Sequence, residues 1–139
     1  MNNVEIRYSR MKVDLADKEL SSSVLDAAIR VHKALGPGFL ESFYEEALCI
    51  ELANQQIPFE RQKSIIINYL GHPIGEHRLD LLIDGKLILE LKAVSALAPV
   101  HFSIVRSYIK ATGASSGLIL NFSAVTLEIK SVGLGISNH

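Results

Sequence analysis

The stretch that decides the fold is Arg78-Leu79-Asp80-Leu81-Leu82-Ile83-Asp84-Gly85-Lys86-Leu87-Ile88-Leu89-Glu90-Leu91-Lys92. Two apolar runs flank Asp84-Gly85, a dipeptide typical of hairpin turns, so the stretch predicts a β-hairpin. Side chains of a strand alternate between its two faces, so Glu90 and Lys92 share one face. Charged groups at the end of a buried hairpin are costly unless they are paired, solvated or bound to a cation.

The length of the hairpin loop decides whether Asp80 joins Glu90 and Lys92. A two-residue loop would place Asp80 opposite Leu89, on the wrong face. A three-residue loop, either Ile83-Asp84-Gly85 or Asp84-Gly85-Lys86, restores the shared face. We therefore predict an odd-length loop, and a strict two-residue turn would refute a site built from these side chains.

Length and composition predict one domain. The chain has 139 residues, of which 48% are hydrophobic and none is tryptophan. We therefore expect a mostly aliphatic core that needs no disulfide or metal ion to stabilise it. The single cysteine, Cys49, excludes an intrachain disulfide and is expected to be a buried, inert thiol.

Charge and hydropathy limit the partners. No segment approaches the ~18 consecutive apolar residues of a membrane span, and residues 1–7 lack the apolar core of a signal peptide. We therefore expect a cytoplasmic protein without a membrane partner. The net charge of −1 is not that of a protein that coats nucleic acid through charge alone.

The apolar spacing predicts an α/β (α+β) fold in the order α-α-β-β-β-α-β-β, with a mixed β-sheet flanked by helices. Ser21-Ser22-Ser23 offers N-cap hydroxyls to the first helix, and Pro99 suits the first position of the third. We expect an N-terminal arm (1–20), one domain (21–132) and a flexible tail (133–139). The expected helices are 22–35, 39–54 and 99–112, and the expected strands are 64–70, 74–83, 86–92, 118–122 and 125–132.

The second predicted helix carries acidic side chains in its first turns. Glu41 and Glu45 are four residues apart, so they project from neighbouring positions. Either acid could complement the helix N-terminus or belong to a site, with Glu45 as the substitute for Glu41. The buried stripe of this helix is expected to comprise Leu40, Tyr44, Ala47, Leu48 and Leu52.

Asp80, Glu90 and a helical glutamate would supply the oxygen ligands that Mg²⁺ or Mn²⁺ prefers. Magnesium usually takes one or two carboxylates and completes its shell with water and substrate phosphate. Lys92, two residues beyond Glu90, would orient or deprotonate an attacking water and neutralise charge. An ordinary surface ion-pair network fits the same pattern, so from spacing alone both interpretations stay open.

Several motifs in one order make the chain resemble the PD-(D/E)XK nuclease superfamily and, more closely, the small bacterial GxxExxY family assigned to it. The resemblance covers about residues 21–132. The residues that carry it are Gly38-Phe39-Leu40-Glu41-Ser42-Phe43-Tyr44, Leu35-Gly36-Pro37-Gly38, Gly75-Glu76-His77-Arg78-Leu79-Asp80-Leu81-Leu82, Glu90-Leu91-Lys92-Ala93-Val94, Tyr108-Ile109-Lys110-Ala111-Thr112-Gly113 and Gly117-Leu118-Ile119-Leu120-Asn121-Phe122.

This resemblance implies a restriction-endonuclease-like αβββαβ core with one extra N-terminal helix, and hydrolysis of phosphodiester bonds that depends on Mg²⁺ or Mn²⁺. Asp80, Glu90 and the Leu91 carbonyl would bind the metal. Lys92 would be the base that orients water, or the cation that stabilises the transition state, and Glu41 the helical acid. The implied substrate is nucleic acid, DNA before RNA, and many nucleases of this fold form homodimers.

Four further side chains are candidates for substrate binding. Arg78 would contact phosphate or pair with Glu90, and His101 would contact substrate or be an ordinary imidazole. Arg106 and Lys110 form a basic edge on the third helix, which a solvated surface would also explain.

One departure from the resemblance keeps other functions open. Related sequences often carry glutamine four residues before Tyr108, where this chain has Ile104. A catalytically degenerate protein that binds nucleic acid or a partner on the same fold is the alternative. Hydrolysis of a small phosphate ester is a third hypothesis.

Overall fold

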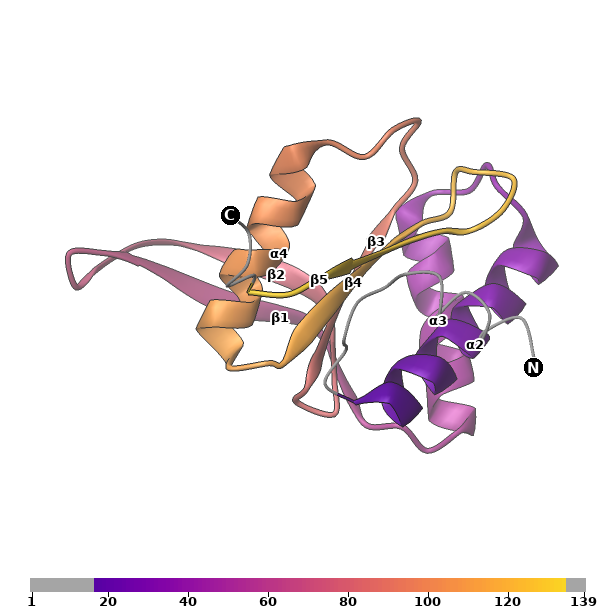
Figure 1. Cartoon of the computed structure of the whole chain (residues 1–139), viewed down its shortest axis with the longest axis horizontal. Helices are drawn as coiled ribbons and strands as arrows, with labels where there is room; N and C mark the ends of the chain where they lie inside the picture. The colour runs from indigo at the N-terminus through magenta and orange to yellow at the C-terminus, as the bar shows by residue number, and fades with distance from the viewer. Residues whose placement is uncertain (1–16, 135–139) are drawn as a thin grey trace.

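A computed structural model describes residues 17–134 of the chain. Within these described residues, three helices and five strands follow one another in the predicted order, as Figure 1 shows. The elements are α2 (Lys18–Leu35), α3 (Glu41–Asn54), β1 (Phe59–Tyr69), β2 (His72–Ile83), β3 (Leu87–Lys92), α4 (Pro99–Thr112), β4 (Ser116–Asn121) and β5 (Glu128–Val132).

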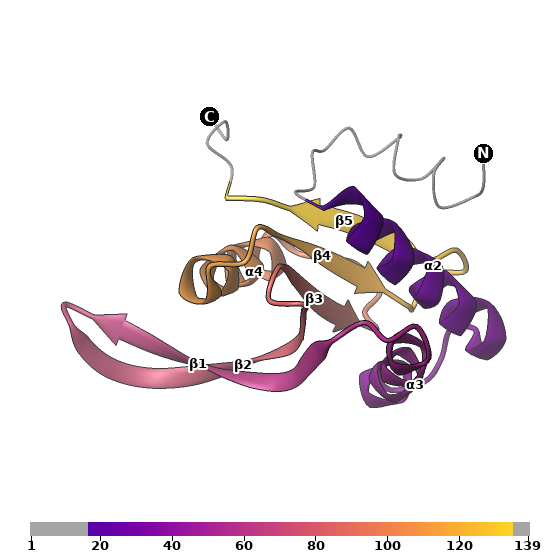
Figure 2. The same cartoon turned by 90° about the horizontal axis from the view of Figure 1, so that it is seen from below.

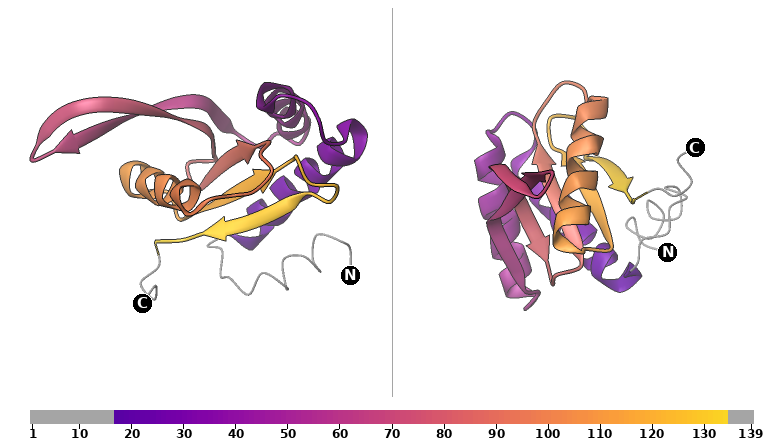
Figure 3. Two further views of the ribbon diagram at one scale, coloured as in Figure 1. Left: turned by 90° about the horizontal axis from the view of Figure 1, so that it is seen from above. Right: turned by 90° about the vertical axis from the view of Figure 1, so that its left-hand side faces the viewer.

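The five strands form one mixed sheet in the order β1-β2-β3-β4-β5. Only β3 and β4 are parallel, and the chain connects them through α4. Helices α2 and α3 pack on one face of the sheet and α4 packs on the other. Each face has its own apolar cluster, and Figures 2 and 3 show the same arrangement. This arrangement confirms the predicted mixed sheet flanked by helices.

The core is mostly aliphatic, as predicted. Leu81, Ile83, Leu89 and Leu91 pack on the side of α2 and α3. Ile88 of β3 packs on the α4 side, because side chains alternate along a strand. Cys49 is a buried free thiol, and burial raises its pKa to about 11, which fits the inert role expected for it.

The hairpin between β2 and β3 has the predicted odd-length loop. Ile83 pairs with Leu87, which leaves Asp84, Gly85 and Lys86 as the loop. Asp84 and Gly85 both have positive φ, 51° and 66°, and the Lys86 N–H donates to the Ile83 carbonyl at 2.9 Å. Aspartate and glycine tolerate this left-handed backbone, so the dipeptide sets the register on which the site depends.

Several predicted boundaries were wrong. Helix α2 begins at Lys18, not near residue 22, because Asp17 is its N-cap and accepts the Leu20 N–H at 2.9 Å. The serines 21–23 therefore lie inside the helix. Strand β1 begins at Phe59 instead of residue 64, and Leu40, expected to be buried, is 70% exposed. Of the predicted arm and tail, residues 1–16 and 135–139 lie outside the described residues.

The β1–β2 hairpin extends beyond the rest of the sheet, away from α2 and α3 (Figure 2). Its strands pair from Phe59–Ile83 to Tyr69–His72, whereas the pairing of β2 with β3 ends at Leu81–Leu89. Among the described strands, the part of β2 from Asp80 back to its beginning pairs with β1 alone, and the sheet opens at that residue.

Candidate active site

Asp80 lies where the strand pairing breaks on both sides. The β2–β3 ladder ends at Leu81, and the β1–β2 ladder is interrupted at Gln62, the residue opposite Asp80. Gln62 has a φ of 50°, which is unusual for a residue other than glycine. Asp80 is therefore paired in neither ladder, and the N–H groups at this break need other partners.

Carboxylates provide those partners. The Asp80 N–H donates to Glu90 Oε1 at 2.9 Å, and the Leu91 N–H donates to Asp80 Oδ2 at 2.8 Å. These reciprocal hydrogen bonds replace the backbone ladder and hold the two acids side by side. The odd-length loop makes this possible because it places Asp80 opposite Glu90.

Both acids are held in a poorly hydrated position. Glu90 is only 6% exposed, and burial, followed by the negative charge of Asp80, raises the pKa of its carboxyl group to about 8. Burial also raises the pKa of Asp80, against the hydrogen bond from Leu91. A buried carboxylate beside a partly buried one is repelled by its charge, so this pair has a strong tendency to bind a proton or a cation.

Lys92 supplies positive charge near this pair. The side chain is half-buried, and its charge lowers the pKa of both Asp80 and Glu90. Its ammonium takes part in none of the ion pairs found among residues 17–134. The Lys92 carbonyl accepts the Phe122 N–H at 2.8 Å, which fixes the end of β3 against β4.

The Leu91 carbonyl faces the same opening as Asp80. The N–H and C=O of one strand residue point to the same side, and the Leu91 N–H points to Asp80. The carbonyl of Leu91 is therefore directed to the β2 side, where the strand pairing has ended.

Helix α3, which packs with α2 on the face opposite α4, brings two acids to the site. The turn before α3 is held by the Tyr44 hydroxyl, which donates to the Gly36 carbonyl at 2.7 Å and accepts the Phe39 N–H at 3.1 Å. Glu41 is exposed and accepts the Ala93 N–H at 3.3 Å, just beyond Lys92. Its charge raises the pKa of both Asp80 and Glu90.

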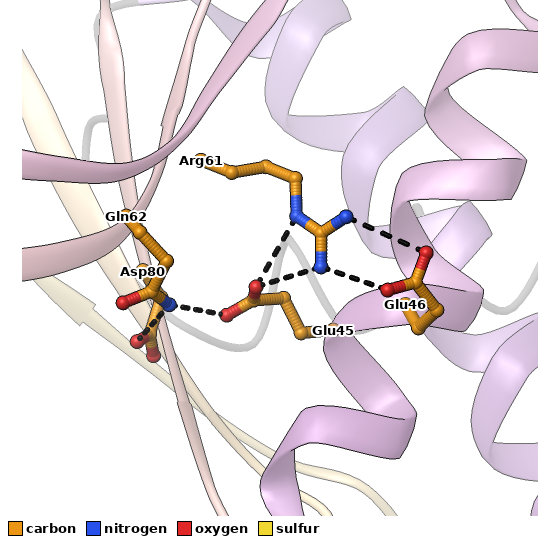
Figure 4. A network of polar contacts seen from close by, with 5 residues as sticks. All are labelled: Glu45, Glu46, Arg61, Gln62 and Asp80. Atoms are coloured by element: carbon orange, nitrogen blue, oxygen red, sulfur yellow. Dashed lines mark hydrogen bonds and ion pairs between the residues drawn. The ribbon is translucent and has the colours of Figure 1, made fainter.

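Glu45 lies on the Asp80 side. It is only 8% exposed and forms an ion pair with Arg61 at 3.0 Å (Figure 4). Its other oxygen accepts the Gln62 amide N–H at 2.7 Å, and that same amide lies 3.5 Å from Asp80 Oδ1. Among neighbouring charges, Glu45 raises the pKa of Asp80 most. Both helical acids therefore belong to the surroundings of Asp80.

The candidate substrate residues have different positions. Arg78 is exposed on β2 and forms no ion pair with Glu90 among the described residues. His101 Nδ1 accepts the Ala98 N–H at 3.0 Å, so this imidazole caps α4. Arg106 lines a hollow of about 430 Å³ at the start of α4, and Lys110 is exposed one turn later. Their contacts with substrate remain predictions.

Three residues of the site were missed by the sequence prediction. Gln62 gave no signal because its role depends on a backbone conformation. Asn121 is 1% exposed, and its amide bonds both the N–H and the C=O of Val94, at 3.1 and 2.9 Å, which holds the segment after Lys92. Burial, then the charges of Glu90 and Asp80, raises the pKa of Tyr108 to about 12, so this tyrosine lies near both acids. The signal available in the sequence was that Tyr108 opens the stretch Tyr108–Gly113, one of those that carry the family resemblance.

The donor set fits a divalent cation that keeps part of its hydration shell. Among residues 17–134, no group of three or more His, Cys, Asp or Glu side chains is arranged to hold a metal ion. Magnesium, however, usually takes one or two carboxylates and completes its shell with water and phosphate oxygens. Asp80, Glu90 and the Leu91 carbonyl are all oxygen donors, and the mutual repulsion of the carboxylates favours a cation.

The mixed sheet flanked by helices is the fold of a restriction-endonuclease-like α+β protein. The solved structure of SSO0001 matches with a TM-score of 0.50 and 16% sequence identity, which supports a common fold. That match covers 92% of this chain and 60% of the other, so the chain spans about 60% of the length of SSO0001. No curated protein matches the sequence significantly.

The family model of the PD-(D/E)XK nuclease superfamily matches residues 18–132. The chain therefore belongs to this superfamily. No helix within residues 17–134 combines the length and hydrophobicity needed to cross a membrane.

Proposed function

We propose that this protein is a divalent-metal-dependent nuclease that hydrolyses phosphodiester bonds in DNA. Within the superfamily we place it in the GxxExxY family, on the motif Gly38–Tyr44. The observation that carries the proposal is the pair of reciprocal hydrogen bonds that holds the buried Glu90 carboxylate beside the partly buried Asp80, with the positive charge of Lys92 near both. Such a pair is costly to bury unless a cation binds there.

In this proposal Asp80, Glu90 and the Leu91 carbonyl hold Mg²⁺ or Mn²⁺. When bound, the ion would neutralise charge on the phosphate and lower the pKa of a bound water. Lys92 orients the attacking water and stabilises negative charge as it develops on the phosphate oxygens. Glu41, which already accepts an N–H beyond Lys92, accepts a hydrogen bond from that water.

Substrate binding is assigned to residues around the opening. Arg78, Arg106 and Lys110 contact backbone phosphates, which compensates for the near-neutral net charge of the chain. His101 contributes the ring nitrogen that is not used as the cap of α4. We propose that the protein acts in the cytoplasm and as a homodimer, because two sites would allow both strands to be cut.

Cleavage assays test this function directly. Supercoiled plasmid, single-stranded DNA and single-stranded RNA are incubated with the protein and Mg²⁺ or Mn²⁺. We expect cleavage of DNA that EDTA abolishes, and loss of about 100-fold or more in rate for Lys92→Ala. Lys33→Ala removes an exposed lysine from the last turn of α2, where it lines a hollow with Val125 and Leu127, and should cleave like the wild type.

One observation favours the rival function, a binding protein without catalysis. Ile104 is half-buried and packs against the apolar cluster beneath α4, so it extends the core where related sequences offer an amide. DNA binding without cleavage, unaffected by Lys92→Ala, would support that rival. Cleavage of a small phosphate diester alone would indicate the third hypothesis.

A further inference from the structure

Gln62 has a strained backbone at the point where the two strand ladders break. Its φ of 50° lies in the left-handed region, which side-chain-bearing residues other than asparagine and aspartate rarely adopt. The pairing of β1 with β2 is lost only at this residue between Phe59 and Ile67. Strain of this kind persists where surrounding contacts impose it, and it is frequent at functional sites.

The contacts that impose this conformation come from two acids on different elements. The Gln62 amide nitrogen donates to Glu45 Oε1 at 2.7 Å and lies 3.5 Å from Asp80 Oδ1 (Figure 4). The preceding residue, Arg61, holds the other Glu45 oxygen at 3.0 and 3.2 Å, and also pairs with Glu46. Consecutive residues of β1 therefore fix both oxygens of one buried glutamate.

We propose that Gln62 is a positioning residue of the metal site, which links the carboxylate of Glu45 to that of Asp80. This inference rests on the proposed function, because it assigns Asp80 to the metal. The amide donates between two negative charges that would otherwise repel each other across an opening in the sheet. It leaves Asp80 Oδ1 at the outer limit of a hydrogen bond, so this oxygen keeps the capacity to accept a further partner.

The linkage gives α3 a defined relation to the site. Asp80 Oδ2 is held by the Leu91 N–H of β3, and its Oδ1 faces the amide of β1. Glu45 in turn fixes that amide from the helix. Partners that orient a metal ligand in this way typically change metal affinity by 10- to 100-fold when they are removed.

Calorimetric titration of Mn²⁺ into variants of the full chain tests the proposal without an activity assay. Gln62→Met keeps the length of the side chain and removes the donor. Gln62→Asn keeps an amide, suits the left-handed backbone better, and is one methylene too short for the same contacts. We expect both to bind Mn²⁺ about tenfold or more weakly than the wild type.

Ser64→Ala is the matched control, because Ser64 is an exposed polar residue of the same strand that bonds Glu76 instead of the site. Its Mn²⁺ affinity should equal that of the wild type. Glu45→Gln measured alone and with Gln62→Met completes a double-mutant cycle. If Gln62 acts through Glu45, the two losses of affinity are less than additive.

The outcomes separate this inference from the proposed function. Unchanged Mn²⁺ affinity in both Gln62 variants, confirmed as folded by circular dichroism, overturns the inference and leaves the nuclease intact. Additive losses overturn the action through Glu45. If Gln62→Met does not fold, the Mn²⁺ affinity of Gln62→Asn alone tests the inference. A wild type that binds no Mn²⁺, even with an oligonucleotide present, refutes the proposed function and this inference with it.

Discussion

Replacing Glu90 by glutamine is expected to stabilise the metal-free protein in alkaline solution. Burial and the charge of Asp80 raise the pKa of Glu90 from an ordinary 4.5 to about 8. A carboxyl group whose pKa is raised on folding contributes its stability fully below the unfolded pKa. This contribution is lost as the pH rises through the folded pKa. The wild type should therefore lose stability between about pH 5 and about pH 9.

The structure sets the size of this effect. At about 1.4 kcal/mol for each pH unit between the folded and unfolded pKa values, the loss is at most about 5 kcal/mol. Small domains are stable by only roughly 5–15 kcal/mol, so the change should be easy to measure. Glutamine keeps an oxygen that can accept the Asp80 N–H, so the substitution removes the charge and preserves the shape.

Urea unfolding followed by circular dichroism, with EDTA present, measures the free energy of unfolding at each pH. The wild type should lose stability relative to Glu90→Gln as the pH rises, and the variant should be the more stable protein at about pH 9. Glu60→Gln removes an exposed carboxylate from β1 and should follow the wild type. A Glu90→Gln variant that is less stable than the wild type at alkaline pH would refute the reasoning.

Three further predictions concern the site and its support. Mn²⁺ should bind more weakly below about pH 8, because the metal must displace the proton of Glu90. The affinity should fall by up to about tenfold per pH unit. Calorimetry at two pH values checks this, and an affinity independent of pH would contradict it. Asn121→Ala should lower the free energy of unfolding in urea by roughly 2–4 kcal/mol, because it removes a buried amide and both of its hydrogen bonds to the partly buried backbone of Val94. A loss below about 1 kcal/mol would argue against that role. Gly117→Ala should cost about 1–3 kcal/mol in the same assay, since the added Cβ would lie 2.6 Å from Val105 Cγ1. Unchanged stability would mean that Val105 moves aside freely.

The central hairpin could be predicted from the sequence because its determinants are local. Asp84-Gly85 specifies a turn. Because side chains alternate along each strand, only a loop of odd length places Asp80 and Glu90 on the same face. Helix α4 was predicted with its observed bounds for a similar reason, because Pro99 marks its first turn and Gly113 ends it in a left-handed conformation.

The rest of the site depends on contacts between distant segments. The strain at Gln62 is imposed by Glu45 and Asp80, which lie 17 and 18 residues away along the chain, and glutamine is not a residue that signals a left-handed backbone. Spacing placed Glu41 and Glu45 on one side of a helix, but their different burial follows from how α3 packs against the sheet. The start of α2 was missed because Asp17 caps the helix ahead of a more conspicuous run of serines.

The most direct test of the account is a calorimetric titration of Mn²⁺ into the wild type and Asp80→Asn. It needs no knowledge of the substrate, and it is repeated with an oligonucleotide present because phosphate completes the shell of such ions. The account predicts a metal site in the wild type that Asp80→Asn loses. Equal binding by the two proteins, or no binding by either with the oligonucleotide present, would contradict a metal-dependent nuclease and favour a binding protein on the same fold.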